Sequence, residues 1–195
     1  DVALKKFGFK NKMVWHEDIE LPKSDLVVLP GGFSYGDYLR CGSVASKSKI
    51  MKSVTNFAKG GGKVMGVCNG FQILVESGLL PGVLLRNKYL EFICKNIFVK
   101  VIDKNSPYFK NIKKDTLELH IAHNEGNYFC TKEQIKEIND NNQVALVYSD
   151  KNGSVDDANN PNGSMKNIAG ILNKEKNVLG MMPHPERMID PTLSG

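Results

Sequence analysis

The sequence predicts an α/β fold with a mostly parallel central sheet and an antiparallel excursion in its second half. Two short apolar runs, "LVVLP" (26–30) and "KVMGV" (63–67), are each followed by a stretch in which apolar residues recur at helical spacing. Continuous apolar runs of this length are typical of strands buried on both faces of a parallel sheet. Strands that alternate with helices favour parallel pairing through right-handed crossovers.

The individual elements follow from local patterns along the chain. The apolar residues between Ser48 and Gly60 fall on one helical face, and the glycine ends that helix. A second helix is expected to begin after Cys68 and to end at about Gly78, and residues 1–9 are interpreted as the end of an earlier helix. In the second half of the chain, strands are predicted at 92–101 and 117–123 and a short helix at 132–138. A surface loop is predicted at 156–164, followed by a hairpin of 168–172 and 178–182.

Composition narrows the class of protein. A chain of 195 residues, 41% of them hydrophobic, suits one compact domain, and no apolar run approaches the ~20 residues of a membrane span. The net charge of +5 comes from scattered lysines without a basic stripe interleaved with aromatics, which disfavours nucleic acid as a partner. The four cysteines are widely separated and include no C-x-x-C pair. We therefore expect reduced thiols in a cytoplasmic protein, with neither a metal site nor a disulfide framework.

The stretch "GVCNGFQIL" (66–74) sets Cys68 between two glycines at a predicted strand-to-helix turn. This matches a nucleophile elbow, in which flanking glycines prevent collisions around a strained turn. The helix N-terminus is expected to lower the pKa of the thiol, and the Asn69 amide can point at an oxyanion. The pattern alone leaves open a buried cysteine whose glycines serve only packing. The other three cysteines, Cys41, Cys94 and Cys130, are predicted to be packed or inert.

A cysteine nucleophile needs a proton acceptor, most often histidine. His184 and Glu186, in "MMPHPER", are two residues apart and project together from an extended segment. A carboxylate beside an imidazole fixes its tautomer and stabilises the imidazolium, which is the third role of a triad. In isolation this pair also fits a solvated surface turn. His123, in "HNEGNYF", is the second candidate base, although its glycine-rich surroundings suit substrate binding better.

Three longer stretches carry a resemblance to a known family. The motif "GVCNGFQ", followed far downstream by "PHPE", resembles the class I (triad) glutamine amidotransferases. With "PGGFSYGDYLRCG" (30–42) and "GMMPHPER" (180–187), it is similar to the glutaminase subunits of phosphoribosylformylglycinamidine synthases of purine synthesis. The similarity extends from about Val14 to Arg187. It implies a flavodoxin-like three-layer sandwich with one amidotransferase domain over residues 1–195. The family's first strand and C-terminal helix are not found, so an incomplete chain is expected.

The resemblance implies a role for each motif residue. Cys68 attacks the side-chain amide of glutamine and forms a γ-glutamyl thioester. His184 protonates the leaving ammonia and then activates water, while Glu186 holds the imidazole in place. Backbone N–H groups meet the oxyanion, which also accounts for small residues at 31 and 32, and neighbouring residues bind glutamine. These are Gly32, Phe33 and Asn69 for the oxyanion, and Gln72, His123, Gly126, Asn127 and Tyr128 for glutamine.

The resemblance also implies partners. The family delivers ammonia to a separate synthetase subunit, which uses ATP and Mg²⁺ to convert formylglycinamide ribonucleotide to the amidine, and a small accessory subunit completes the complex. No cofactor is expected in this chain, and neither nucleic acid nor a membrane is an expected partner. "YGDYLRCG" (35–42) and the loop 156–164 are predicted to face the partners. The alternatives are another class I amidotransferase, a γ-glutamyl hydrolase, or an inactive amidotransferase-like scaffold, and the long motif and complete triad argue against them.

Overall fold

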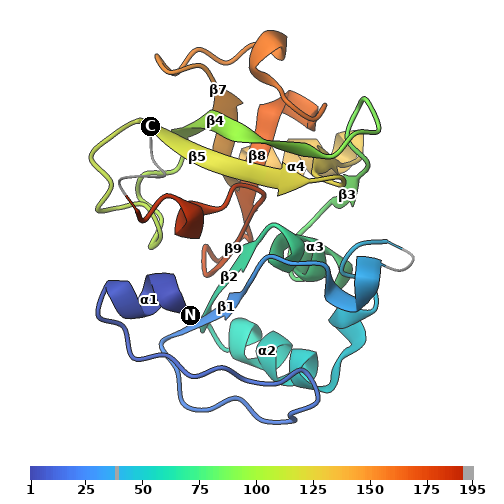
Figure 1. The fold of residues 1–195 in the computed structure, drawn as a ribbon. Coiled ribbons are helices and arrows are strands. Elements are labelled where there is room, and N and C mark those ends of the chain that lie inside the picture. The colour runs from blue at the N-terminus through green and yellow to red at the C-terminus, as the bar shows by residue number, and fades with distance from the viewer. Residues whose placement is uncertain (38–39, 191–195) are drawn as a thin grey trace.

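The structure is a computed structural model that describes residues 1–37 and 40–190. The described residues form a seven-stranded sheet in the order β1-β2-β9-β8-β7-β4-β5, with a two-stranded sheet of β3 and β6 beside it (Figure 1). The strands are β1 Leu26–Leu29, β2 Lys63–Val67, β3 Val83–Leu85, β4 Ile93–Val101, β5 Thr116–His123, β6 Asn127–Phe129, β7 Val144–Ser149, β8 Ile168–Leu172 and β9 Val178–Met181. The helices are α1 Val2–Lys6, α2 Lys49–Lys59, α3 Asn69–Glu76 and α4 Lys132–Asp140.

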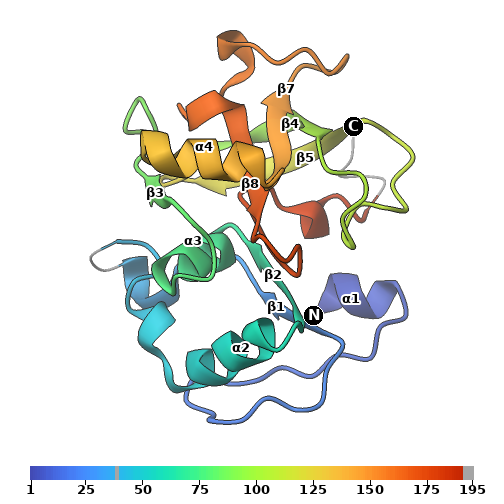
Figure 2. The ribbon, with the colours of Figure 1, turned by 180° about the vertical axis from the view of Figure 1, so that it is seen from behind.

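The first half of the chain builds the parallel part of the sheet, as predicted. β1 pairs with β2 and β2 pairs with β9, all in parallel register. Helices α2 and α3 cover one face of these strands, and Figure 2 shows the molecule from the side on which these helices lie. Gly180 of β9 makes room for this layer, because a Cβ there would lie 2.1 Å from the Phe71 ring of α3. The prediction that β1 is buried on both faces is wrong, since β1 lies at the edge of the sheet and is only half-buried.

The second half builds the antiparallel part. The predicted hairpin is confirmed by the antiparallel pairing of β8 with β9, and β7, β4 and β5 continue the sheet in antiparallel register. The helix predicted near residue 132 is α4, which begins with a capping box between Thr131 and Gln134. Strand β7 and the small β3–β6 sheet were not predicted. No helix in the described part of the chain is long and apolar enough to cross a membrane.

The loop at 156–164 differs from its prediction as a surface loop. Its first half is exposed, but Asn162 and Ser164 are fully buried. The Asn162 side-chain amide donates to the carbonyl of Gly126 at 2.8 Å, and the Ser164 hydroxyl donates to the same carbonyl at 3.1 Å. These polar side chains are buried because they satisfy backbone groups of the segment after β5. The loop therefore braces one wall of the candidate site.

Candidate active site

Cys68 sits at a sharp turn between β2 and α3. Its backbone angles, φ 50° and ψ −105°, are ones that a non-glycine residue rarely adopts. A Cβ at Gly66 would lie 2.6 Å from the carbonyl oxygen of Gly70, and a Cβ at Gly70 would lie 2.0 Å from the carbonyl oxygen of Leu29. Both glycines are required because the first turn of α3 passes directly over the ends of β1 and β2. This is the geometry of a nucleophile elbow.

The thiol of Cys68 is buried and held by its neighbours. The side chain is 5% exposed, and Sγ lies 3.7 Å from the carbonyl oxygen of Ala122 on β5. Burial raises the pKa of Cys68 to about 12, although the Asn69 backbone N–H and the Arg187 charge act in the opposite direction. The expectation of a lowered pKa is therefore wrong, because desolvation outweighs the helix N-terminus. Attack by this sulfur must be accompanied by transfer of its proton.

His184 follows β9 and forms a close pair with Glu186. The imidazole Nδ1 lies 2.6 Å from Glu186 Oε1, and the backbone N–H of His184 donates to the carbonyl of His120 at 2.7 Å. The histidine is 2% exposed, so the alternative of a solvated surface turn is wrong. Its Nε2 is buried without a hydrogen-bond partner. With the proton on Nδ1 shared with the carboxylate, Nε2 is left as an acceptor.

The carboxylate of Glu186 is held in its ionised form. Burial raises the pKa of Glu186, but the hydrogen bond from His184 and the positive charges of His184 and Arg187 outweigh burial, and the net effect lowers the pKa. A carboxylate that stays ionised fixes the tautomer of His184 and stabilises the imidazolium once it forms.

Gly31, at the end of β1, lies between the two reacting side chains. A Cβ there would be 2.6 Å from Cε1 of His184 and 3.5 Å from the Cβ of Cys68. The nucleophile and the imidazole therefore converge on this glycine from different strands. The register explains the convergence, since Val67 pairs with Met181 and the Cys68 N–H donates to the Met181 carbonyl at 2.8 Å. From the sequence, Gly31 is predicted only to leave room for the oxyanion, and its contact with His184 is not predicted.

The predicted oxyanion residues lie next to the elbow. Gly32 has a φ of 146°, a conformation that favours glycine, and Phe33 is exposed. The backbone N–H of Ser34 donates to Oδ1 of Asn69 at 3.3 Å, which ties this loop to the first turn of α3. The loop and the nucleophile are thus held together by the Asn69 side chain.

Gln72 connects α3 to the segment after β5. Its Oε1 accepts from the Asn69 side chain at 2.9 Å, and its Nε2 donates to the carbonyl of Glu125 at 2.6 Å. Gln72 is 5% exposed, so it is buried in the wall of the site and not displayed on the helix surface. The sequence does not predict this hydrogen bond to the carbonyl of Glu125.

His123 is buried under Gly126. Its Nδ1 lies 3.1 Å from Oδ1 of Asn87, and a Cβ at Gly126 would lie 2.4 Å from its ring. Burial, with a smaller effect of the His184 charge, lowers the pKa of His123 to about 4, so this imidazole is neutral at pH 7. Asn87 also donates to the carbonyl of His123 at 2.9 Å and accepts from the Gly126 N–H at 3.1 Å. No sequence signal marked Asn87, which lies in a polar turn.

The side chains of Asn127 and Tyr128 are engaged elsewhere. Asn127 donates to the carbonyl of Arg86 at 3.3 Å, and the fully buried Tyr128 donates its hydroxyl to the carbonyl of Pro81 at 2.9 Å. The Tyr128 N–H also donates to the Ser164 hydroxyl at 3.0 Å, so both residues brace the wall of the site. No group of three metal-binding side chains occurs among residues 1–37 and 40–190.

Comparisons with known proteins identify the family. The sequence profile of the CobB/CobQ-like glutamine amidotransferase domain matches residues 2–194. Subunit PurQ of phosphoribosylformylglycinamidine synthase from Pelagibacter ubique is 82% identical over 195 residues, covering 100% of this chain and 86% of the relative. The subunit of the same name from Wolinella succinogenes is 50% identical, covering 98% of this chain and 85% of the relative.

Solved structures of amidotransferase proteins have a similar fold. The structure of PurLQS from Thermotoga maritima matches with a TM-score of 0.86 and 40% identity, over 100% of this chain and 84% of that one. The glutaminase domain of a Trypanosoma brucei CTPS matches with a TM-score of 0.60 at 15% identity, over 98% of this chain and 79% of that one, which supports the fold alone. The three-layer arrangement expected from the sequence is thus confirmed. The chain belongs to the CobB/CobQ-like glutamine amidotransferase family.

Proposed function

We propose that this chain is the glutaminase subunit of a phosphoribosylformylglycinamidine synthase. It hydrolyses glutamine and supplies the ammonia to a synthetase subunit. The observation that supports the chemistry most directly is the convergence of buried Cys68 and buried His184 at Gly31, with Glu186 hydrogen-bonded to the imidazole. The acceptor reaction is supported by the curated relatives, which carry the name of that synthase.

The reaction begins with transfer of the Cys68 proton to Nε2 of His184 as Sγ attacks the amide carbon of glutamine. This transfer is necessary because the buried thiol has a raised pKa, and it is possible because Nε2 is not occupied by a hydrogen bond to another group. Glu186 stabilises the imidazolium through Nδ1. The tetrahedral oxyanion is met by the backbone N–H of Asn69 and by a backbone N–H of Gly32 or Phe33. Donors of this kind are commonly worth about 10²–10³ in rate each.

The tetrahedral intermediate then collapses, and His184 gives its proton to the departing ammonia. A γ-glutamyl thioester remains on Cys68. Water takes the position that ammonia has left, and His184 removes a proton from it as it attacks the thioester carbon. Glutamate is released with the Cys68 proton restored, so the site returns to its starting state.

Glutamine is held by a wall that the Asn69 side chain connects to the oxyanion loop. Gln72 and the segment 123–128 form this wall through a continuous set of hydrogen bonds that includes the carbonyl of Glu125. In this proposal Gln72, Gly126, Asn127 and Tyr128 shape the wall against which glutamine binds, and His123 lies behind Gly126. The buried Asn162 and Ser164 hold the carbonyl of Gly126 from behind.

The partners in this proposal are an ATP- and Mg²⁺-dependent synthetase subunit and a small accessory subunit, in the cytoplasm. The support is the similarity to a structure described as PurLQS. The proposed partner-facing surface includes the exposed residues 156–158 and the stretch 35–42, of which residues 38 and 39 lie outside the described residues. Asn162 and Ser164 no longer belong to that surface, because they are buried.

Glutamate release from glutamine tests the proposal. The full chain is assayed alone and with a synthetase subunit, the accessory subunit, ATP and formylglycinamide ribonucleotide. We expect weak hydrolysis alone and a strong rise in the complex, with both lost in Cys68→Ala and retained in Cys130→Ala, a matched change at a buried cysteine outside the site. Hydrolysis that survives Cys68→Ala contradicts the triad. Hydrolysis that does not respond to the synthetase contradicts the subunit assignment.

A further inference from the structure

A second thiol and imidazole pair lies outside the proposed triad, on strands β4 and β5. Sγ of Cys94 is 3.4 Å from Nε2 of His120, and Nδ1 of His120 is 2.9 Å from Oδ1 of Asn96. Asn96 in turn donates through Nδ2 to Glu118 at 3.2 Å. A nucleophile, a base and a group that orients the base are thus connected in series. None of these side chains has a role in glutamine hydrolysis.

Strand register brings the three side chains together. Asn96 is directly opposite His120, and Cys94 is opposite Ala122, so Cys94 lies diagonally across from His120 on the same face of the pair. Because Nδ2 of Asn96 is turned toward Glu118, its Oδ1 accepts from Nδ1 of His120. The proton is therefore on Nδ1, and the lone pair of Nε2 faces the thiol.

The environment keeps this imidazole in its neutral form. Burial lowers the pKa of His120, and the nearby positive charges of Arg187 and His184 lower it further, against a smaller opposing effect of Glu186. A neutral imidazole is a proton acceptor at pH 7. The geometry of the cluster and the charge state of its base therefore agree.

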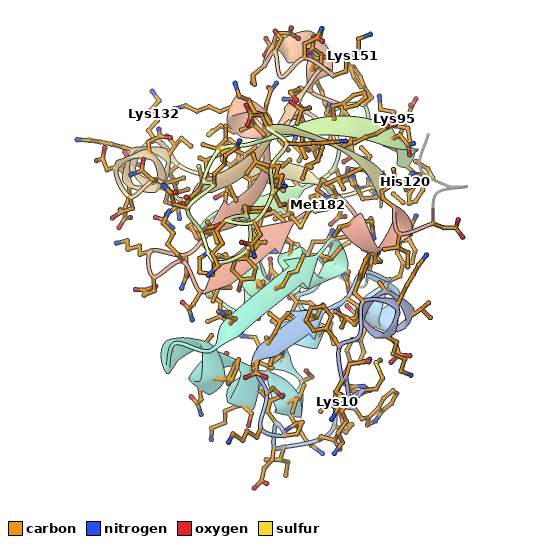
Figure 3. The ribbon with its side chains drawn as sticks, turned by 90° about the vertical axis from the view of Figure 1, so that its left-hand side faces the viewer. Lys10, Lys95, His120, Lys132, Lys151 and Met182 are labelled. Atoms are coloured by element: carbon orange, nitrogen blue, oxygen red, sulfur yellow. The ribbon has the colours of Figure 1, made fainter. Side chains whose placement is uncertain are left out.

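Cys94 is also accessible, unlike the other cysteines. It is exposed, whereas Cys41, Cys68 and Cys130 are buried. It lines an open hollow of about 810 Å³ between β4 and residues 149–161. Lys95 and Lys151 line this hollow together with Glu91, Asp150 and Asp157, so its lining carries charges of both signs. Figure 3 labels the two lysines and His120. The hollow is large enough for a small peptide-like molecule and suits one that carries both carboxylate and ammonium groups.

We propose that Cys94 is a modification site that exchanges with small peptide disulfides of the glutathione type. His120 accepts the Cys94 proton as Sγ attacks one sulfur of the disulfide. The Cys94–sulfur bond forms while the sulfur–sulfur bond of the reagent breaks, and the departing thiolate takes the proton from His120. The reagent disulfide is the only oxidant that this balance needs. The lysines and acidic residues that line the hollow pair with the carboxylate and ammonium groups of the bound reagent.

This site is adjacent to the proposed active site but separate from it. The carbonyls of His120 and Ala122 contact the His184 N–H and the Cys68 thiol, so β5 lies between the two cysteines. The side chains of Cys94, His120 and Asn96 touch neither catalytic residue in the described contacts. Failure of one proposal can therefore be told apart from failure of the other by the choice of variant.

The test is the rate and position of adduct formation. The reduced full chain is incubated with oxidised glutathione, and the adduct is followed by intact mass and located by peptide mapping. We expect one adduct at Cys94, absent in Cys94→Ser and retained in Cys68→Ala. Replacing the base, His120→Gln, is expected to slow the reaction by roughly 10²-fold, as for loss of a general base. His16→Gln, at a partly exposed histidine far from β4 in sequence, is the matched control and keeps the wild-type rate.

The pH profile separates a base from a structural support. With His120 as base, the wild-type rate is expected to change little near neutral pH. In His120→Gln it is expected to rise about ten-fold per pH unit, as for an isolated thiol below its pKa. Circular dichroism of each variant checks that the fold is kept. An adduct at another cysteine, or equal rates and profiles for His120→Gln and wild type, overturns the proposal.

Discussion

Gly31 lies between the two side chains that carry the proposed chemistry, and its surroundings explain why no larger residue fits. Its backbone lies outside the left-handed region, so the main chain itself tolerates a side chain. The obstacle is the His184 ring, 2.6 Å from the position of a Cβ. Substitution here therefore acts on the imidazole and not on the fold.

Gly31→Ala is expected to lower kcat for glutamine hydrolysis by roughly 10²-fold, because a misplacement of about 1 Å at a reacting group costs that much. The unfolding midpoint is expected to change little. Gly60→Ala, where a Cβ meets only ordinary contacts at 3.4 Å, is the control. A large fall in stability with unchanged kcat would contradict this reading of Gly31.

Glu186 tests the role of charge in the same site. Glu186→Gln keeps a side chain that can accept from Nδ1 of His184 but removes the negative charge. Loss of this charge in a buried triad costs about 10⁴ in kcat. The Glu186 side chain is 42% exposed, so we expect a smaller fall of roughly 10- to 10³-fold. Steady-state kinetics measures it, with the exposed Glu20→Gln as control, and unchanged kcat would remove Glu186 from the triad.

At the scale of elements, the strand-to-helix turn at Cys68 depends on how closely α3 approaches β1. A Cβ at Gly70 would lie 2.0 Å from the Leu29 carbonyl oxygen, and backbone atoms cannot move aside as a flexible side chain can. The strain of the elbow, with Cys68 at a φ of 50°, is held in place by this packing.

Gly70→Ala is therefore expected to destabilise the protein by about 1–3 kcal/mol or more, the range for overpacking in a well-packed interior. Denaturant unfolding measures the change, again against Gly60→Ala. Because α3 must move away from β1, we also expect a loss of activity that exceeds the fraction unfolded. A variant as stable as wild type would show that the helix is not held against β1.

At the scale of the whole molecule, the buried His123 links stability to pH. The folded state lowers its pKa from an ordinary value near 6.5 to about 4. The unfolded chain therefore binds a proton at a higher pH than the folded chain does. The contribution of His123 to the free energy of unfolding should be greatest above pH 6.5 and should fall as the pH drops from 6.5 toward 4.

The shift corresponds to roughly 3 kcal/mol between those limits. His123→Gln is expected to flatten this part of the pH dependence, while His16→Gln leaves it unchanged. Urea unfolding at intervals from pH 7 to pH 4 measures both. A slope that persists unchanged in His123→Gln would place the titrating group elsewhere.

The sequence by itself determined the local elements and the chemistry of the motifs. The positions of α2, β2, α3 and the β8–β9 hairpin follow from apolar periodicity and from glycines at the turns, which act over a few residues. The elbow around Cys68 and the pairing of His184 with Glu186 also follow from short spacings. These features need no knowledge of distant parts of the chain.

Only the tertiary structure decided burial and the contacts between distant segments. It made β1 an edge strand, buried Asn162 and Ser164, and raised the pKa of Cys68 where the helix N-terminus alone predicts the opposite. It also placed Gly31 against the ring of His184 and brought the Cys94 thiol next to the imidazole of His120. The physical reason is that desolvation and close packing depend on which strands become neighbours. That order is set by the cooperative assembly of the whole sheet and not by any local pattern.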